Sequence, residues 1–343
     1  MFKQILLILL LVFLVAPAHC RNRHVINFRW PNLYPESFTW DPKSDHFVMG
    51  SLRHPQLISV SDAGVVSALL SDESLPFNSS FIGISLDPRL HRLLAVVRRP
   101  TPPFAALAAY DLPTFRQIFL APLDDLLPSA TAAAVANDVA VDYSGNAYVT
   151  DSANDVIYRV TEQGDATVLS RSNTFKSHTV DRTVPVSIGD PVKHGKLFKV
   201  NADDGTARRV LLNRDLTAAD GIAVRSDGVV LVVSKQKLYF IKSDDSWSEG
   251  VVFDETALEE ERHASSVAVG AEDRVYVLYG HVDEGIMGNA ERDEFSIVEI
   301  ESEEENKEEK VWVFVLIGFG LAYFLYWRFQ MKQLVQNMNK KTA

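Results

Sequence analysis

The chain has 343 residues, of which 47% are hydrophobic and 23% charged, and its 34 basic and 45 acidic side chains give a formal charge of −11. This length is ample for one large or two ordinary domains with a real core, and the apolar content excludes a disordered chain. A single cysteine and 17 glycines exclude a disulfide-stapled or collagen-like protein, and the acidic balance argues against a nucleic-acid partner.

The N-terminal segment has the layout of a cleaved secretory signal peptide. Within residues 1–20, Lys3 precedes an apolar run of about a dozen residues, and the small residues Ala16, Ala18 and Cys20 follow it. We expect cleavage after Ala18 or Cys20, and the alternative is a signal anchor that stays in place. This signal predicts that the rest of the chain enters the secretory pathway.

A recurring hairpin pattern predicts the fold. Each copy has a small or polar first residue, a short apolar strand, a four-residue turn and a second β-branched strand. The first residues of the copies are Glu36, Ile82, Asn137, Asp220 and Ser265. Their spacings are 46, 55, 83 and 45 residues, and the interval of 83 is close to two periods. Units of this length predict an all-β, six-bladed β-propeller over residues 21–300, with a degenerate or incomplete fourth blade.

Two parts of the predicted ring depart from the repeat. Residues 176–195 occupy the place of the fourth blade's inner hairpin but contain two prolines and no hairpin turn. We interpret them as an alternative exon or gene-model error, or else as a real loss of both inner strands. The outer strands of this blade are expected at 196–200 and 208–212. The last blade ends at 295–300 without a fourth strand, which residues 24–28 are expected to supply, closing the ring.

Polar residues begin three of the innermost strands, namely Glu36, Asn137 and Asp220. In a propeller these first residues converge on the central channel at one face, so two carboxylates and an amide are expected together. Hard oxygen donors suit Ca²⁺ or Mg²⁺ rather than zinc. Each residue taken alone is explained by a turn or a strand cap, whereas the three together predict a metal or substrate site.

The segments around these residues resemble a known family. Residues 34–42 (YPESFTWDP), 137–142 (NDVAVD) and 220–224 (DGIAV) look like blade leaders of the gluconolactonase/senescence-marker protein (regucalcin) family. That family belongs to the calcium-dependent phosphotriesterase superfamily of six-bladed propellers, together with paraoxonases and strictosidine synthase-like proteins. The resemblance covers about residues 30–300.

The resemblance implies a site and an activity. It implies that Glu36 and Asp220 bind a divalent metal, Ca²⁺ by preference, that Asp220 also acts as the general base, and that Asn137 contacts substrate or metal. The family's fourth-blade asparagine has no counterpart near residue 180, so one ligand is missing. The expected function is hydrolysis of a small ester, lactone or phosphotriester by metal-activated water. The competing interpretation is a non-catalytic binding or scaffolding propeller.

A second apolar run, residues 311–327, has 17 residues without a charge and predicts a transmembrane helix. An acidic stalk at 301–310 precedes it, and a basic tail at 328–343 follows. Because positive charge stays on the cytoplasmic side, the tail is expected in the cytosol and the propeller in the lumen. A buried core helix is the alternative.

Two short signals refine the expected localisation. Lys340 and Lys341, fourth and third from the carboxyl end, look like a dilysine retrieval signal, which predicts coat machinery as a partner and the endoplasmic reticulum membrane as the location. Asn78 begins an Asn-Ser-Ser sequon and is expected to be glycosylated in the lumen.

Overall fold

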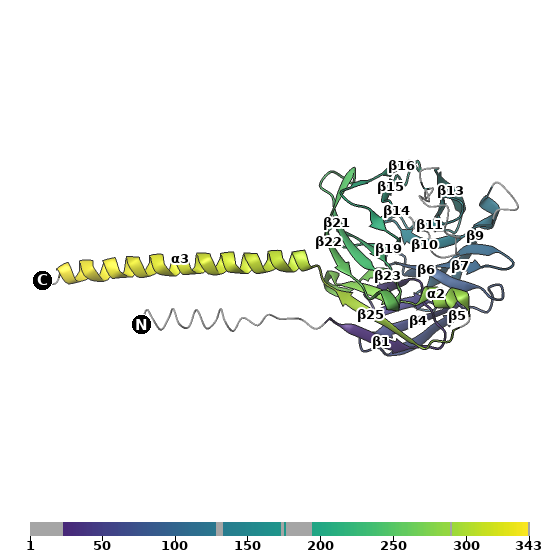
Figure 1. The fold of residues 1–343 in the computed structure, drawn as a ribbon, viewed down its shortest axis with the longest axis horizontal. Helices are drawn as coiled ribbons and strands as arrows, with labels where there is room; N and C mark the ends of the chain where they lie inside the picture. The colour runs from purple at the N-terminus through teal and green to yellow at the C-terminus, as the bar shows by residue number, and fades with distance from the viewer. Residues whose placement is uncertain (1–22, 128–132, 173–174, 176–193, 289, 342–343) are drawn as a thin grey trace.

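The computed structural model describes residues 23–127, 133–172, 175, 194–288 and 290–341. These residues form five sheets, each with at least four antiparallel strands, arranged around an axis, and a long helix projects from one side (Figure 1). The architecture is therefore an all-β propeller, as predicted. The predicted signal peptide, residues 1–20, and most of the altered segment 176–195 lie outside the described residues.

The first three blades each run from the innermost strand outward, and every strand pairs with the next. Blade 1 comprises β2 (Phe38–Asp41), β3 (His46–Gly50), β4 (Gln56–Ser61) and β5 (Val66–Ser71). Blade 2 comprises β6 (Ser80–Asp87), β7 (Arg92–Arg99), β8 (Phe104–Asp111) and β9 (Gln117–Pro122), and the short 3-10 helix η1 (Asp124–Leu126) follows it. Blade 3 comprises β10 (Ala136–Val141), β11 (Ala147–Asp151), β12 (Val156–Val160) and β13 (Ala166–Arg171).

The remaining full blades follow the same order and are numbered by the predicted repeat. Blade 5 comprises β19 (Ala219–Val224), β20 (Val230–Ser234), β21 (Lys237–Lys242) and β22 (Glu249–Ala257). Blade 6 comprises β23 (Ala264–Val269), β24 (Val275–Tyr279) and β25 (Glu294–Ile300). The helices η3 (Glu260–Arg262), η4 (Ala271–Asp273) and α2 (Val282–Met287) lie before or between these last strands.

Blade 6 takes its outer strand from the beginning of the chain. β1 (Val25–Arg29) pairs antiparallel with β25 over its whole length, from Val25 opposite Val298 to Arg29 opposite Glu294. Ile26 and Phe28 alternate with exposed residues and are buried. The predicted closing strand is confirmed.

The fourth repeat is described only in its outer part. β15 (Phe198–Val200) and β16 (Ala207–Arg209) form the expected hairpin, and β14 (His194–Gly195) pairs with β18 (Leu216–Thr217). The strand expected at 208–212 is divided, because β17 (Leu211–Leu212) pairs in parallel with β22 of blade 5. The small Gly250 in β22 permits this approach, since a Cβ there would lie 2.9 Å from the Leu212 side chain. Five blades are thus described, and the sixth remains a prediction.

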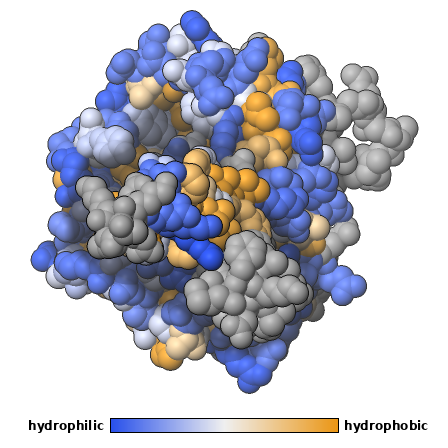
Figure 2. All heavy atoms as spheres, turned by 90° about the vertical axis from the view of Figure 1, so that its left-hand side faces the viewer, coloured by the Kyte–Doolittle hydropathy of each residue, from blue (hydrophilic) through white to orange (hydrophobic). Residues whose placement is uncertain are grey.

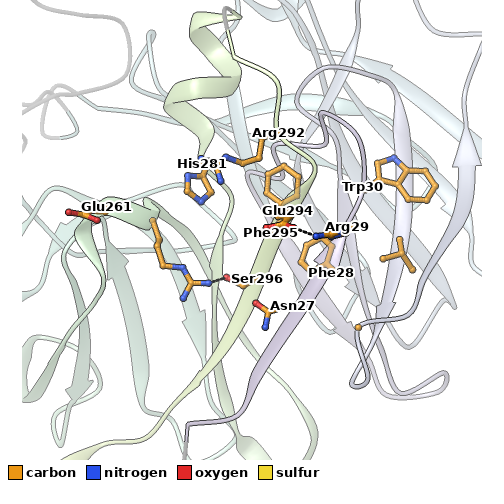
Figure 3. A pocket seen from close by; sticks show the side chains of 13 residues that line it. Asn27, Phe28, Arg29, Trp30, Glu261, His281, Arg292, Glu294, Phe295 and Ser296 are labelled. Carbon is orange, nitrogen blue, oxygen red and sulfur yellow. Dashed lines mark hydrogen bonds and ion pairs between the residues drawn. The ribbon is translucent and has the colours of Figure 1, made fainter.

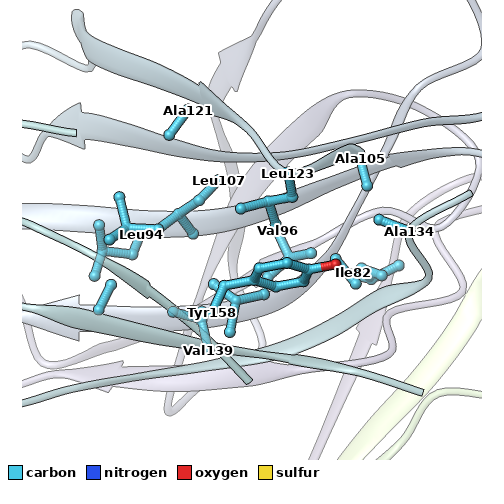
Figure 4. Packing of buried hydrophobic residues seen from close by; sticks show 14 of the residues in the cluster. Ile82, Leu94, Val96, Ala105, Leu107, Ala121, Leu123, Ala134, Val139 and Tyr158 are labelled. Carbon is cyan, nitrogen blue, oxygen red and sulfur yellow. The ribbon is translucent and has the colours of Figure 1, made fainter. Parts of the chain in front are cut away.

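Adjacent blades pack through their apolar faces. Figure 4 shows one such layer, in which Leu94, Val96 and Leu107 of blade 2 lie against Val139 and Tyr158 of blade 3. These side chains recur at every second position of their strands, so each strand directs one apolar row into the layer. Burial of such rows stabilises the ring by about 25 cal/mol for each Å² of apolar surface removed from water.

The C-terminal helix α3 (Glu303–Lys341) begins directly after blade 6. Its segment Phe314–Gln336 is long and apolar enough to cross a membrane, judged by length and composition, and is exposed. The apolar helix agrees with the prediction, although its span lies nearer the C-terminus than 311–327. The predicted stalk, 301–310, is largely the first turns of the same helix. Figure 2 shows the side from which α3 projects, so that this helix points toward the viewer. Hydrophobic residues gather near the centre of this view, and hydrophilic residues surround them.

Polar contacts hold the first turn of α3 against blade 5. Arg225, in the turn after β19, donates to both carboxylate oxygens of Glu305, over 2.6 and 3.0 Å. The Ser302 hydroxyl donates to Asp254 of β22 over 2.6 Å. Because the Arg225 side chain is only 13% exposed, this attachment is more than a surface ion pair.

A buried arginine joins blades 2 and 3. The Arg92 side chain is 2% exposed and donates from Nε to Asp87 over 3.1 Å, from Nη1 to the carbonyl of Glu162 over 2.9 Å, and from Nη2 to the carbonyl of Gly145. Each of the three guanidinium nitrogens therefore donates to a carboxylate or carbonyl oxygen, and such partners are the condition under which a buried charge is tolerated.

We expect Arg92→Met to destabilise the propeller by about 3–5 kcal/mol, because it leaves the buried Asp87 carboxylate without its partner. The matched control is Arg89→Met, since Arg89 lies in the same turn but pairs with Glu162 at the surface, where both side chains are over 40% exposed. Its cost is expected to be about 0–1 kcal/mol. Equilibrium denaturant unfolding measures both, and equal costs would contradict the assigned role of Arg92.

Candidate functional site

The innermost strands β2, β6, β10, β19 and β23 all begin at one face of the ring, which we call the leader face. Neighbouring innermost strands contact one another from β19 through β23, β2 and β6 to β10. The segment before β2 is held from both sides, because Ser265 Oγ donates to the Pro35 carbonyl over 3.2 Å and the Ile84 N–H donates to Ser37 Oγ over 3.4 Å. Glu36, between Pro35 and Ser37, is therefore fixed at the leader face.

β-Bulges interrupt the innermost strands where they begin. In β10 the register shifts between Ala136 and Val139, and in β19 it shifts between Ala219 and Gly221. β6 and β23 carry equivalent shifts. A bulge breaks the alternation of side chains between the two faces of a strand and redirects those in it. The predicted site residues Asn137 and Asp220 both lie in these bulges.

Glu36 and Asp220 come within electrostatic reach of each other. Burial first, and then the negative charge of Asp220, raise the pKa of Glu36 to about 8, whereas the nearby Arg98 guanidinium opposes the shift. Glu36 remains partly accessible, and the side chain of Asp220 is exposed at the same face. Two of the three predicted residues are therefore brought close enough for their charges to interact.

Asp138 is a third carboxylate in this cluster and was not predicted. Its charge also raises the pKa of Glu36. Burial raises the pKa of Asp138 itself to about 6, against the effect of the Val139 N–H, which donates to Asp138 Oδ1 over 2.9 Å. Its position next to Asn137 at the start of a strand was the signal available in the sequence.

Arg98 supplies a positive charge to the cluster, and it too was not predicted from the sequence. It lies near the end of β7, opposite Ser80, and so reaches the leader face from a second strand rather than a first one. The Ser80 hydroxyl donates to its carbonyl over 3.1 Å. Two consecutive arginines, Arg98 and Arg99, end an otherwise apolar strand, which was the only sequence signal.

Asn137 is placed by a close approach between blades 2 and 3. A Cβ at Gly83 of β6 would lie 2.6 Å from the Asn137 carbonyl oxygen and 2.9 Å from Asp138 Oδ1. Only glycine allows β6 and β10 to come so close. Substitution of Gly83 would therefore displace both Asn137 and Asp138.

The oxygen atoms of this cluster suit a hard cation, but the set of metal-binding side chains is incomplete among the described residues. Among the described residues, no group of three or more His, Cys, Asp and Glu side chains is arranged around one point as a metal site requires. The predicted fourth-blade position falls outside the described residues. The metal ligands Glu36, Asn137 and Asp220 therefore remain predictions.

The fold and its leader-face cluster define the class of protein, a β-propeller with a C-terminal apolar helix. No family model and no curated protein matches the sequence. Among solved structures, the major Malassezia sympodialis allergen Mala s 1 is similar with a TM-score of 0.65 and 16% identity, over 81% of this chain and 96% of that one.

Two enzymes share the fold at lower similarity. A gluconolactonase from Xanthomonas campestris is similar with a TM-score of 0.52 and 15% identity, over 82% of this chain and 91% of that one. A luciferin-regenerating enzyme gives a TM-score of 0.50 and 13% identity, over 81% and 95%. At these identities the comparisons establish the fold, and they do not transfer an activity.

We expect stability in the presence of a chelator to fall as pH rises from about 4.5 to 8. Folded Glu36 holds its proton up to a pKa of about 8, whereas the ordinary value is 4.5, so the unfolded chain binds fewer protons across this window. Glu36→Gln should be more stable than the parent at pH 8.5 and should lose less stability between pH 5 and 8.5. Urea unfolding at several pH values measures this, and parallel pH profiles for the two proteins would contradict it.

Proposed function

We propose that this chain is a membrane-anchored hydrolase of small ester, lactone or phosphotriester substrates that depends on a divalent metal, Ca²⁺ by preference. The observation that carries the proposal is the gathering of carboxylates from three blades, in which the charges of Asp138, Asp220 and the cation Arg98 all act on Glu36. The sequence resemblance to gluconolactonase-like propellers and the shared fold support the same class of activity.

The proposed ligands are Glu36, Asn137 and Asp220. Carboxylate and amide oxygens are the donors that Ca²⁺ takes. Like charges near Glu36 disfavour its ionised form, and a bound cation would offset that repulsion. When bound, such an ion polarises a carbonyl or phosphoryl oxygen and lowers the pKa of a water molecule.

Three side chains of the cluster supply the other catalytic roles in this proposal. Asp220, exposed at the leader face, is the proposed general base and takes a proton from the attacking water. Arg98 presents a planar set of N–H donors that can orient a substrate oxygen and stabilise developing negative charge. Asp138, with a pKa of about 6, is protonated in only a minority of molecules at pH 7, and that form can donate its proton to a leaving oxygen.

A non-catalytic binding or scaffolding propeller of the endoplasmic reticulum lumen is the second candidate. The observation that favours it is the incomplete set of metal-binding side chains among the described residues. The two functions differ in a measurable property, because a scaffold needs neither Ca²⁺ nor an ionised Asp220.

We expect the full-length chain in lipid nanodiscs to bind Ca²⁺ and Asp220→Ala to bind it at least about tenfold more weakly, since one carboxylate ligand is removed. Calorimetric titration measures this, and an esterase and lactonase screen follows with the same proteins. Asp227→Ala, at the opposite end of β19, is the matched control and should bind as the parent does. No binding by the parent would favour the scaffold, and equal binding by Asp220→Ala would refute the site.

We also propose that α3 spans the endoplasmic reticulum membrane with the propeller in the lumen, and that coat machinery recognises Lys340 and Lys341. Asn78 lies exposed with a positive φ of 64° in the turn between β5 and β6, which suits it as a glycan acceptor.

We expect the expressed chain to carry one glycan that endoglycosidase H removes and that Asn78→Gln abolishes. Replacement of both Lys340 and Lys341 by alanine should convert that glycan to a resistant form, because the protein then leaves the endoplasmic reticulum. Gel mobility reports both results. A resistant glycan on the parent chain would contradict the proposed retention.

A further inference from the structure

A second concave site lies on the rim of the ring, and none of its lining residues belongs to the leader-face cluster. The cavity has a volume of about 920 Å³. Its walls come from β1, β25, the η3 segment, the loops on both sides of α2 and the turn between β4 and β5 (Figure 3). Small-molecule sites commonly occupy about 300–1,000 Å³, so this volume suits an organic ligand of several rings.

The arginines at this cavity are matched by carboxylates, and a further carboxylate that lines it, Glu261, is exposed to solvent. Every arginine that lines it is already paired with a carboxylate. The pairs are Arg29 with Glu294, Arg262 with Glu259 over 3.2 Å, and Arg292 with Glu284 over 2.9 Å. A simple anion would have to compete with an existing carboxylate at each arginine. Glu261 is exposed, so water and salt screen its charge, and the cavity favours a ligand without net charge.

Neutral polar groups complete the lining. His281 is 7% exposed and its Nδ1 has no hydrogen bond among the described residues, because Glu284 Oε1, at 3.3 Å, lies outside hydrogen-bond geometry. Burial lowers the pKa of His281, so the ring is neutral at pH 7. The Ser296 hydroxyl accepts from Arg262, and the exposed Asn27 lies directly opposite Ser296 on the neighbouring strand β1. The site therefore presents both donors and acceptors.

An aromatic ring stands at the other end of the cavity. Trp30 is partly exposed, and its indole N–H donates to Gln56 Oε1 over 3.2 Å, which fixes the orientation of the ring. Figure 3 shows Trp30 on one side of the contact between Arg29 and Glu294 and His281 on the other. The lining therefore includes an aromatic ring on one side of this ion pair and a neutral imidazole on the other.

We propose that this cavity binds a neutral oligosaccharide. Sugar rings carry hydroxyl groups that both donate and accept, which matches the neutral polar groups and the paired Arg and Glu side chains. Their C–H faces are apolar and stack on a fixed indole such as Trp30. A chain of several rings fills a cavity of about 920 Å³ better than a single ring does.

The test titrates chitotriose, maltotriose and mannotriose into the full-length chain carrying Asn78→Gln, so that no glycan of its own is present. Lipid nanodiscs replace sugar-based detergents, which would compete. We expect one of the three sugars to bind with a Kd below about 1 mM by calorimetry. Trp30→Ala should weaken that binding at least about tenfold, and Asn27→Ala, at an exposed side chain, about threefold or more.

Trp40→Ala is the matched control, because Trp40 packs partly buried against the same apolar cluster as Trp30 but does not line the cavity. It should bind sugar as the parent does, and so should Asp220→Ala, which separates this site from the proposed hydrolase site. Absence of binding by all three sugars, or binding of 2-naphthoate in preference to them, overturns the proposal. Equal affinities for Trp30→Ala, Asn27→Ala and the parent overturn it as well.

Discussion

The pairing of β1 with β25 is the constraint on which the other features of the ring depend. It joins the beginning of the folded chain to its last blade through five matched residue pairs and buries Ile26 and Phe28. Without it, β25 would present an unpaired edge, and the first and last blades could separate. The entropic cost of closing a loop grows only slowly with loop length. β1 and β25 can therefore pair despite their long sequence separation once the blades between them have formed.

Closure brings the starts of the innermost strands together, and this proximity has an electrostatic cost. Glu36 is raised in pKa to about 8 because burial and like charges act on it at once, and Arg98 opposes only part of the effect. Carboxylates that repel one another in a fold are tolerated where function requires them. Asn137 and Asp220 lie in bulges, which break the regular alternation of side chains along their strands. Since bulges are frequent next to functional sites, they also favour a functional role for this cluster.

The hairpins and the closing strand could be predicted because their signals are local and repeated: alternating apolar residues, four-residue turns, and one strand too few in the last blade. Asp138 and Arg98 could not be predicted in this way. A regular strand would direct Asp138 away from Asn137, and only the bulge removes that expectation. Arg98 comes from a blade whose own first residue, Ile82, is apolar, so a search for polar first residues passed over it.

The two ends of β19 relate the proposed site to the proposed anchor. Asp220 lies at its beginning and Arg225 just after its end, about 17 Å apart at the rise of an extended strand. Arg225 holds Glu305 in the first turn of α3, so the helix is attached at the face opposite the carboxylate cluster. With α3 as the membrane span, the leader face is open to the aqueous phase. Substrates of the proposed hydrolase would therefore arrive from water rather than from the bilayer.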